Sequence, residues 1–214
     1  MPTDTRTARL WPRLLLLSGL ALLFWSGAWP HDRLTWLLEV SPILVGVPVL
    51  IATYRRCRLT NLVYGLIGVH ALVLMLGGHW TYAEMPLFNW LRDALHWHRN
   101  HYDRLGHLAQ GFIPAILARE VLLRTSPLRP GRWLAFIVVS ICLALSAAYE
   151  LFEWVTALVL RQGADQFLGT QGDPWDTQED MLCALVGAVL GLLCLSRVHD
   201  AALRRLGALK PGES

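Results

Sequence analysis

Six apolar stretches separated by charged connections constrain this chain more than any other feature of its sequence. They are Leu14–Trp29, Leu34–Tyr54, Asn61–Gly77, Leu105–Leu123, Trp133–Leu160 and Met181–Val198. A helix that crosses the hydrocarbon core of a bilayer needs about 20 mainly apolar residues. A soluble bundle would need polar faces at the helical period, and these stretches lack them. The pattern therefore predicts an all-α, polytopic integral membrane protein with about six transmembrane helices, forming a single domain over residues 1–214.

The composition supports a membrane protein over a soluble one. Only 16% of the residues are charged and 54% are hydrophobic, whereas a soluble domain carries roughly 25% charged residues. Pro42, Pro48 and Pro114 fall inside the apolar stretches. Proline is better tolerated in membrane helices, because neighbouring helices satisfy the backbone groups that it frees.

The positions of the basic residues predict the orientation in the membrane. One set of 14 lies in the two tails and around the second and fourth connections, namely Arg6, Arg9, Arg13, Arg55, Arg56, Arg58, Arg119, Arg124, Arg129, Arg132, Arg197, Arg204, Arg205 and Lys210. The other 5 are Arg33, Arg92, Arg99, Arg104 and Arg161. Because cytoplasmic loops carry an excess of Lys and Arg, both termini are predicted to be cytoplasmic. The net charge of +3 then reflects orientation and contact with anionic lipids in the bilayer, and not nucleic-acid binding.

The first apolar stretch has a second interpretation. Basic residues, a short apolar run and the small residues Ser26, Gly27 and Ala28 are also typical of a secretory signal that is cleaved after Ala28. Trp25 within the run and Pro30 beyond it argue against cleavage. Removal of this segment would take away one helix and leave the remaining topology unchanged.

Three predicted helices each bring a pair of ionisable side chains to the outer membrane boundary. Asp103 and His107 are four residues apart at the start of the fourth helix, and Asp176 and Asp180 are four apart leading into the sixth. In the fifth helix, Glu150 and Glu153 are three apart. Spacings of three and four place both members of a pair on one helix face.

Glu150 is the most unusual member because of its depth. At 1.5 Å per residue it lies about 25 Å along a helix that begins near Trp133. An ionisable group at that depth is costly unless it is paired, protonated or hydrated, and so indicates a functional site. The alternative is a structural hydrogen bond between helices, for instance to His107. Glu153 is expected nearer the surface, where a solvated carboxylate needs no partner.

Carboxylates with imidazole suit divalent zinc, manganese or iron. The candidate metal ligands are Asp103, His107, Glu150, Asp176 and Asp180, and the candidate catalytic residues are His107, Glu150 and Asp103. No spacing here is diagnostic in the way that H-E-x-x-H is, and no dinucleotide or Walker pattern is present to bind another cofactor. A proton path across the membrane is not expected, because the inner halves of the helices read as apolar.

Three segments resemble the YjdF family of bacterial inner-membrane proteins. They are His101–His107 (HYDRLGH), Tyr149–Trp154 (YELFEW) and Gly169–Met181 (GTQGDPWDTQEDM). The resemblance covers most of the chain. It implies a multi-pass protein of the bacterial inner (plasma) membrane, in a family whose biochemical role is not established.

A looser similarity is to VanZ-like proteins, whose pattern is an Asp-Lys-x-x-His start, a later Glu, and an Asp with a Gly seven positions on. Asp103 and His107 match the first part, Glu150 the second, and Asp180 with Gly187 the third. The chain departs from the pattern with Arg104 in place of lysine and Ala184 in place of asparagine. VanZ-like proteins are associated with glycopeptide resistance and the cell envelope, which implies an envelope lipid or polyprenyl-linked substrate.

Three classes of function follow from these observations. The first is a membrane-embedded enzyme, with or without a bound metal, that acts on an envelope lipid or other amphiphile from a site facing the periplasm. The second is a proton-coupled transporter or flippase in which Glu150 carries the proton. The absence of visible inverted repeats argues against that class. The third is a structural or accessory membrane protein in which the acids and histidines only tie helices together.

Overall fold

A computed structural model of the protein describes residues 5–160 and 170–209, with side chains described from residue 10 to 159 and from 170 to 209. Within these ranges the regular structure is entirely helical. Its elements are α1 (Thr5–Ala28), α2 (Arg33–Thr53), α3 (Asn61–Trp80), the short 3-10 helix η1 (Tyr82–Glu84), α4 (Pro86–Leu95), α5 (Tyr102–Thr125), α6 (Arg132–Leu160) and α8 (Asp176–Arg205). Arg161 and Lys210, which entered the charge count, lie outside the described residues.

The structure confirms an all-helical membrane protein. Five helices are long and apolar enough to cross a membrane: α1 from Leu10, α2, α3, α6 to Val159, and α8. α5 is not among them, although it is long and packs against α3, α6 and α8. Its status as a sixth span stays a prediction. Three helices start several residues earlier than predicted, α1 at Thr5, α5 at Tyr102 and α8 at Asp176. Acidic residues in the first turns of α5 and α8 favour helix starts there, because the N-terminus of a helix carries a partial positive charge.

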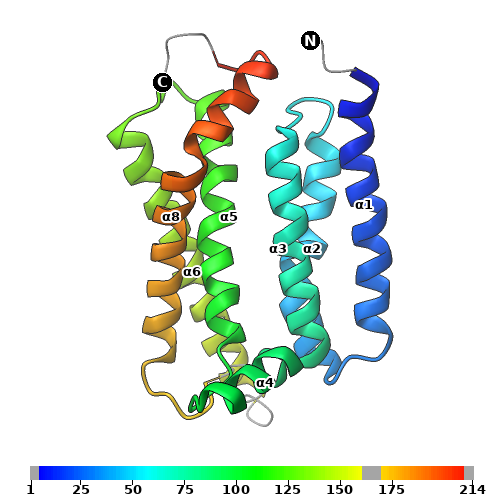
Figure 1. Ribbon diagram of the computed structural model, residues 1–214, viewed down its shortest axis with the longest axis vertical. Helices are drawn as coiled ribbons and strands as arrows, with labels where there is room; N and C mark the ends of the chain where they lie inside the picture. Colours follow the sequence, from blue (N-terminus) through cyan, green and yellow to red (C-terminus); the bar gives the residue numbers. More distant parts are fainter. Residues whose placement is uncertain (1–4, 161–169, 210–214) are drawn as a thin grey trace.

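The long helices form two groups of three (Figure 1). α1 and α2 pack on α3, whereas α5, α6 and α8 pack on one another, and contacts between α3 and α5 join the groups. The start of α1 and the end of α8 lie at one end of the bundle, and α4 lies across the other end (Figure 1). A start of α1 and an end of α8 at the same end of the bundle are what the predicted topology requires, and the side of the membrane on which they lie stays a prediction.

Hydrogen bonds connect the end of α1, the start of α2 and the end of α3. The Asp32 side chain caps α2 by accepting from Thr35 N at 2.7 Å. Trp36 Nε1 then donates to Ser26 Oγ at 3.1 Å, which ties the start of α2 to the end of α1. His79 Nδ1 lies 2.8 Å from Ser26 O. These contacts hold α1, α2 and α3 together at the α4 end of the bundle.

Glycine residues allow α5 and α8 to pack backbone against backbone. A Cβ atom on Gly111 would collide with the Ala184 carbonyl oxygen, and one on Gly187 would collide with that of Leu108. Small residues at helix contacts are the usual means of close packing in membranes. The two helices are parallel, so their first turns lie side by side (Figure 1). This contact brings the ionisable residues at the start of α5 next to those at the start of α8.

We expect Gly187→Ala to destabilise the protein, because its new methyl group must push α8 away from the backbone of α5. Overpacking of this kind costs about 1 to 3 kcal/mol. Gly65→Ala is the matched control, since a Cβ there meets nothing within 4 Å. Thermal unfolding of the two variants in detergent measures the difference. Equal stability would show that α5 and α8 do not depend on this contact.

Candidate functional site

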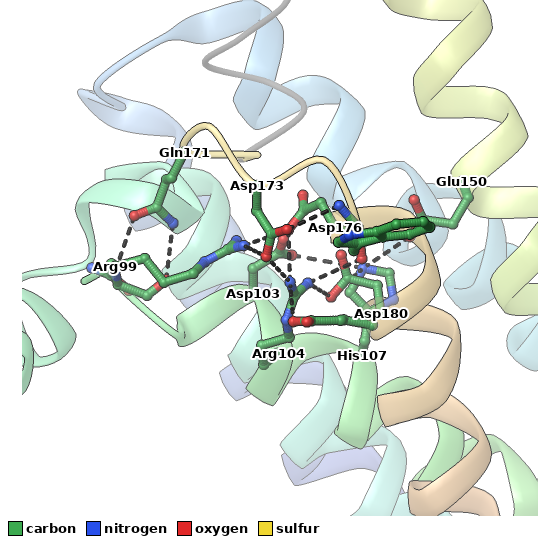
Figure 2. Close-up of polar contacts among 12 residues, drawn as sticks. Arg99, Asp103, Arg104, His107, Glu150, Gln171, Asp173, Asp176 and Asp180 are labelled. Carbon is green, nitrogen blue, oxygen red and sulfur yellow. Dashed lines mark hydrogen bonds and ion pairs between the residues drawn. The ribbon is translucent and has the colours of Figure 1, made fainter. Parts of the chain in front are cut away.

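Six buried carboxylic side chains from four helices gather at the α4 end of the bundle, and we call them the acidic cluster. They are Glu39 of α2, Asp103 of α5, Glu150 and Glu153 of α6, and Asp176 and Asp180 of α8. None of them is more than 8% exposed. Figure 2 shows four of them, Asp103, Glu150, Asp176 and Asp180, around His107. The predicted convergence of side chains from three helices is therefore present, and α2 adds a fourth helix to it.

His107 lies at the centre of this arrangement. Its Nε2 atom is 3.6 Å from Asp103 Oδ1, 3.4 Å from Glu150 Oε1 and 3.9 Å from Asp180 Oδ1. Asp103, His107 and Asp180 each offer a ligand atom, and these atoms all lie within 4.8 Å of one another. Two of these residues come from one face of α5 and the third from the parallel α8. The geometry is suited to a bound divalent cation.

Two arginines hold the acids of α8 in place. Arg104 Nη1 contacts Asp180 Oδ1 at 2.5 Å, and Arg104 Nη2 contacts Asp176 Oδ1 at 2.9 Å. Arg99 Nη1 binds the same Asp176 oxygen at 2.6 Å. Asp176, which was predicted as a metal ligand, is paired with guanidinium groups in the structure and is not in the Asp103–His107–Asp180 group. Its role as a metal ligand stays a prediction.

Hydrogen bonds between neighbouring loops hold Arg99 in place. The backbone of the next residue, Asn100, exchanges two hydrogen bonds of 2.9 Å with the Gln171 side chain. The Asn100 side chain also donates to Asn89 Oδ1 of α4 at 2.8 Å. Asp173 binds Arg99 Nη1 at 3.2 Å. The hydrogen bond that Asp173 accepts from the backbone N–H of Trp175 is the main cause of its lowered pKa. The guanidinium groups of Arg99 and Arg104 lower this pKa further. Asp173 is therefore ionised at neutral pH and adds its charge to this ion-pair network.

The four other histidines between Gly78 and Arg104 are not part of this group. His79 stacks on Trp25 with ring centroids 4.7 Å apart, and His96 and His98 are exposed. Burial is the main cause that lowers the pKa of His101, and Arg99 and Arg104 act in the same direction. None of these four has a ligand atom in the group that His107 forms with Asp103 and Asp180.

Several polar atoms beside His107 have no hydrogen-bond partner among the described residues. They are His107 Nδ1 and Gln110 Oε1 on α5, and Ser146 Oγ and Glu150 Oε1 on α6. The spacings of three and four residues put each pair on one helix face. Buried polar atoms in native proteins are normally hydrogen-bonded or bound to water or an ion. These atoms therefore indicate a polar ligand or water held between α5 and α6.

The charges of the acidic cluster are not balanced by the described side chains around it. Its six carboxyl groups face two guanidinium groups, Arg99 and Arg104, and one imidazole. Asp103, Asp176, Asp180 and Glu150 are close enough to repel one another electrostatically. Unpaired charge buried in a membrane protein is costly. A bound cation or bound protons would relieve this repulsion.

Glu39 is a member of the cluster that the sequence reasoning missed. It is 4% exposed, and its Oε2 accepts a hydrogen bond from the Tyr149 hydroxyl at 3.3 Å. The available signal was an acid inside the apolar stretch Leu34–Tyr54, which by itself indicates a functional site. Glu153 was expected to be solvated and is instead only 8% exposed, because it faces the other helices of the cluster.

A second buried polar group lies at the opposite ends of α5 and α8, and we call it the Glu120 cluster. Its members are Thr60, Arg119, Glu120, Arg124, His199 and Asp200. Glu120 accepts from Thr60 Oγ1 at 2.7 Å and from Arg124 Nη1 at 2.9 Å, and it contacts His199 Nε2 at 3.1 Å. The expectation that the inner halves of the helices are apolar is therefore wrong.

The fold and the acidic cluster define a polytopic helical membrane protein with a buried ionisable site. Residues 11–201 match the model of a family described as "Predicted membrane protein (DUF2238)". Over 208 residues the chain is 49% identical to inner membrane protein YjdF of Escherichia coli (strain K12), covering 96% of this chain and 99% of that protein. The chain belongs to this family, as its motifs predicted. No solved structure matches it significantly. The similarity to VanZ-like proteins stays a prediction.

We expect Glu120→Ala to lower stability strongly, because it leaves Arg124 and His199 without their shared anion. Breaking a buried ion pair by removing one partner costs about 3 to 5 kcal/mol. Asp93→Ala is the control, since its side chain is 69% exposed and pairs with the neighbouring Arg92. Chemical unfolding in detergent measures both. A Glu120→Ala protein as stable as the control would show that the cluster does not support the fold.

Proposed function

We propose that this protein is a membrane-embedded, divalent-metal-dependent enzyme that acts on the polar part of a cell-envelope lipid. The observation that carries the proposal is the group Asp103, His107 and Asp180, whose ligand atoms lie within 4.8 Å of one another. All three side chains are buried. They belong to a cluster with more carboxyl groups than basic side chains among the described residues.

Each residue of the site has a distinct role in this proposal. Asp103, His107 and Asp180 hold the cation with a mixed oxygen and nitrogen ligand set, which suits manganese, zinc or iron. Such a cation supplies Lewis-acid chemistry and an activated water. Glu150 Oε1 has no hydrogen bond from the part of the chain that the structure describes and lies 3.4 Å from His107 Nε2. Glu150 is therefore positioned to accept a proton from a water beside the ligands.

Arg104 and Asp176 support the site without binding the metal. Arg104 contacts both Asp176 and Asp180 and so fixes the direction of the Asp180 carboxylate. Asp176 in turn holds Arg99. In metal sites, partners that orient the ligands tune affinity nearly as strongly as the ligands themselves. Arg104 and Asp176 act here as positioning residues.

The nature of the substrate follows from the location of the site. The chain's family relative is an inner membrane protein, and the arrangement of basic residues supports an orientation of the acidic cluster towards the periplasm. A polar site at one end of a membrane-spanning bundle lies near the headgroups of the adjoining leaflet. An envelope lipid or a polyprenyl-linked amphiphile is the corresponding substrate class.

Transport is a weaker proposal even though the Glu120 cluster supplies polar groups at the other end of the bundle. Between the two clusters, α5 and α8 are in direct contact through Gly111 and Gly187. Ala115 and Ala188 continue the contact in an apolar core with Val138. A proton or substrate that crossed the protein would have to pass this layer. An accessory role would leave the unpartnered atoms beside His107 without a purpose.

The periplasmic orientation of the site predicts a labelling pattern. In a variant without the four native cysteines, we introduce Asp93→Cys on the exposed face of α4 (side chain 69% exposed). A membrane-impermeant maleimide should label it in intact spheroplasts. A variant that keeps only Cys57, in the predicted cytoplasmic turn, should be labelled only after permeabilisation. The reverse pattern would place the acidic cluster in the cytoplasm.

Metal analysis of the purified protein tests the proposed cofactor. We expect stoichiometric metal in the wild type after incubation with Mn²⁺ or Zn²⁺, and background levels in His107→Ala and Asp180→Asn, because each change removes a ligand. Glu150→Gln should keep the metal, since Glu150 lies outside the ligand group. His98→Ala, at an exposed loop position, is the control. Wild-type protein that binds neither ion would contradict the proposal.

A further inference from the structure

A lateral groove lies between α2 and α6, on the outside of the bundle. Its volume is about 300 Å³, and its lining includes Pro42 and Val45 from α2 and Leu145, Ala148, Tyr149 and Phe152 from α6. Both helices are long and apolar enough to cross the membrane. Val45 is 67% exposed and Leu145 is 52% exposed. The medium around these side chains is therefore hydrocarbon, and an occupant of the groove must itself be apolar.

The groove extends from the lipid towards the acidic cluster. From Leu145 to Phe152 it follows about 10 Å of α6, at 1.5 Å per residue. Tyr149 lines the groove and also reaches the site, because its hydroxyl donates to Glu39 Oε2 at 3.3 Å. The Tyr149 ring meets the His107 ring edge to face, with centroids 6.4 Å apart. One side chain thus forms part of both the apolar groove and the polar site.

We propose that this groove holds the hydrocarbon chain of a lipid substrate whose oxyanion head binds at Asp103, His107 and Asp180. The inference rests on the proposed function and adds to it the form of the substrate. A divalent cation among carboxylates favours a phosphate or carboxylate head, because hard oxygen anions complete its coordination. The groove between two helices accommodates one hydrocarbon chain. Tyr149 lies at the position where this chain would join the polar head of the lipid.

The groove contributes more to the orientation of the lipid substrate than to its binding affinity. Lipid tails are as apolar as the lining of the groove, so moving a chain from the bilayer into it has little hydrophobic driving force. A chain should therefore dwell in the groove only when its head is bound at the site. Holding a reacting group in the correct position is itself a large part of catalysis. Groove occupancy is consequently expected to depend on both the cation and the ligand residues.

Photo-crosslinking with a defined probe tests this dependence. The full-length protein is placed in phosphatidylcholine nanodiscs with Mn²⁺ and a trace of a long-chain alkyl phosphate that carries a diazirine in its chain. Labelled positions are mapped by mass spectrometry. We expect labelling of Leu145–Phe152 about tenfold above that at Leu193, a 74% exposed lipid-facing residue of α8, which corresponds to about 1.4 kcal/mol of preference. His107→Ala should reduce it to the Leu193 level.

Ala148→Phe should abolish the excess labelling, because the ring fills the groove. Ala144→Phe is the matched control, since Ala144 is an equally small exposed residue one turn along α6 and outside the lining. Retained metal shows that each variant is folded. In the wild type alone, comparison of the labelling of Leu145–Phe152 with that of Leu193 already tests whether the groove holds the chain of the probe. Bound metal with labelling no greater than at Leu193 overturns the groove alone. Absence of metal from the wild type overturns the proposed function and this inference together.

Discussion

The close contact between α5 and α8 is the constraint on which the rest of the structure depends. Because Gly111 and Gly187 lack side chains, the two helices meet along their length and keep a common register. That register sets both buried polar clusters. At one end it places Asp180 beside His107, and at the other it places His199 against Glu120. Charged residues in a bilayer are tolerable only with partners, so the contact makes these acids compatible with a membrane.

The fold and much of the site were predictable from the sequence, for physical reasons. The bilayer fixes the length of a spanning segment, so apolar stretches locate helices well. Helical periodicity also placed Asp103 and His107 on one face. Helix ends were less predictable, because the charged turns of α5 and α8 are helical although they are not apolar. The pairing of side chains between helices was the hardest feature to predict. Nothing in the neighbouring sequence shows that Asp176 faces Arg99 and Arg104.

The residues that were missed show where hydropathy reasoning fails. Glu39 lies alone within an apolar stretch, and a window average conceals one acid among many aliphatic neighbours. Glu120, inside the predicted stretch Leu105–Leu123, and His199, just after Met181–Val198, were not singled out, and they are 79 positions apart in the sequence. Their burial comes from the packing of α5, α8 and the start of α3. An individual charge near the end of an apolar stretch therefore needs to be judged by its possible partners, not by the average of its surroundings.

The parallel arrangement of α5 and α8 has an electrostatic consequence of its own. Both helices begin beside the acidic cluster (Figure 1), so the N-termini of the two helices lie next to each other. Each helix start carries about half a positive charge, and in a low-dielectric surrounding such fixed dipoles act strongly. The backbone itself therefore gives this end of the bundle an attraction for anions that no side-chain substitution removes. Reversing the direction of either helix would eliminate it.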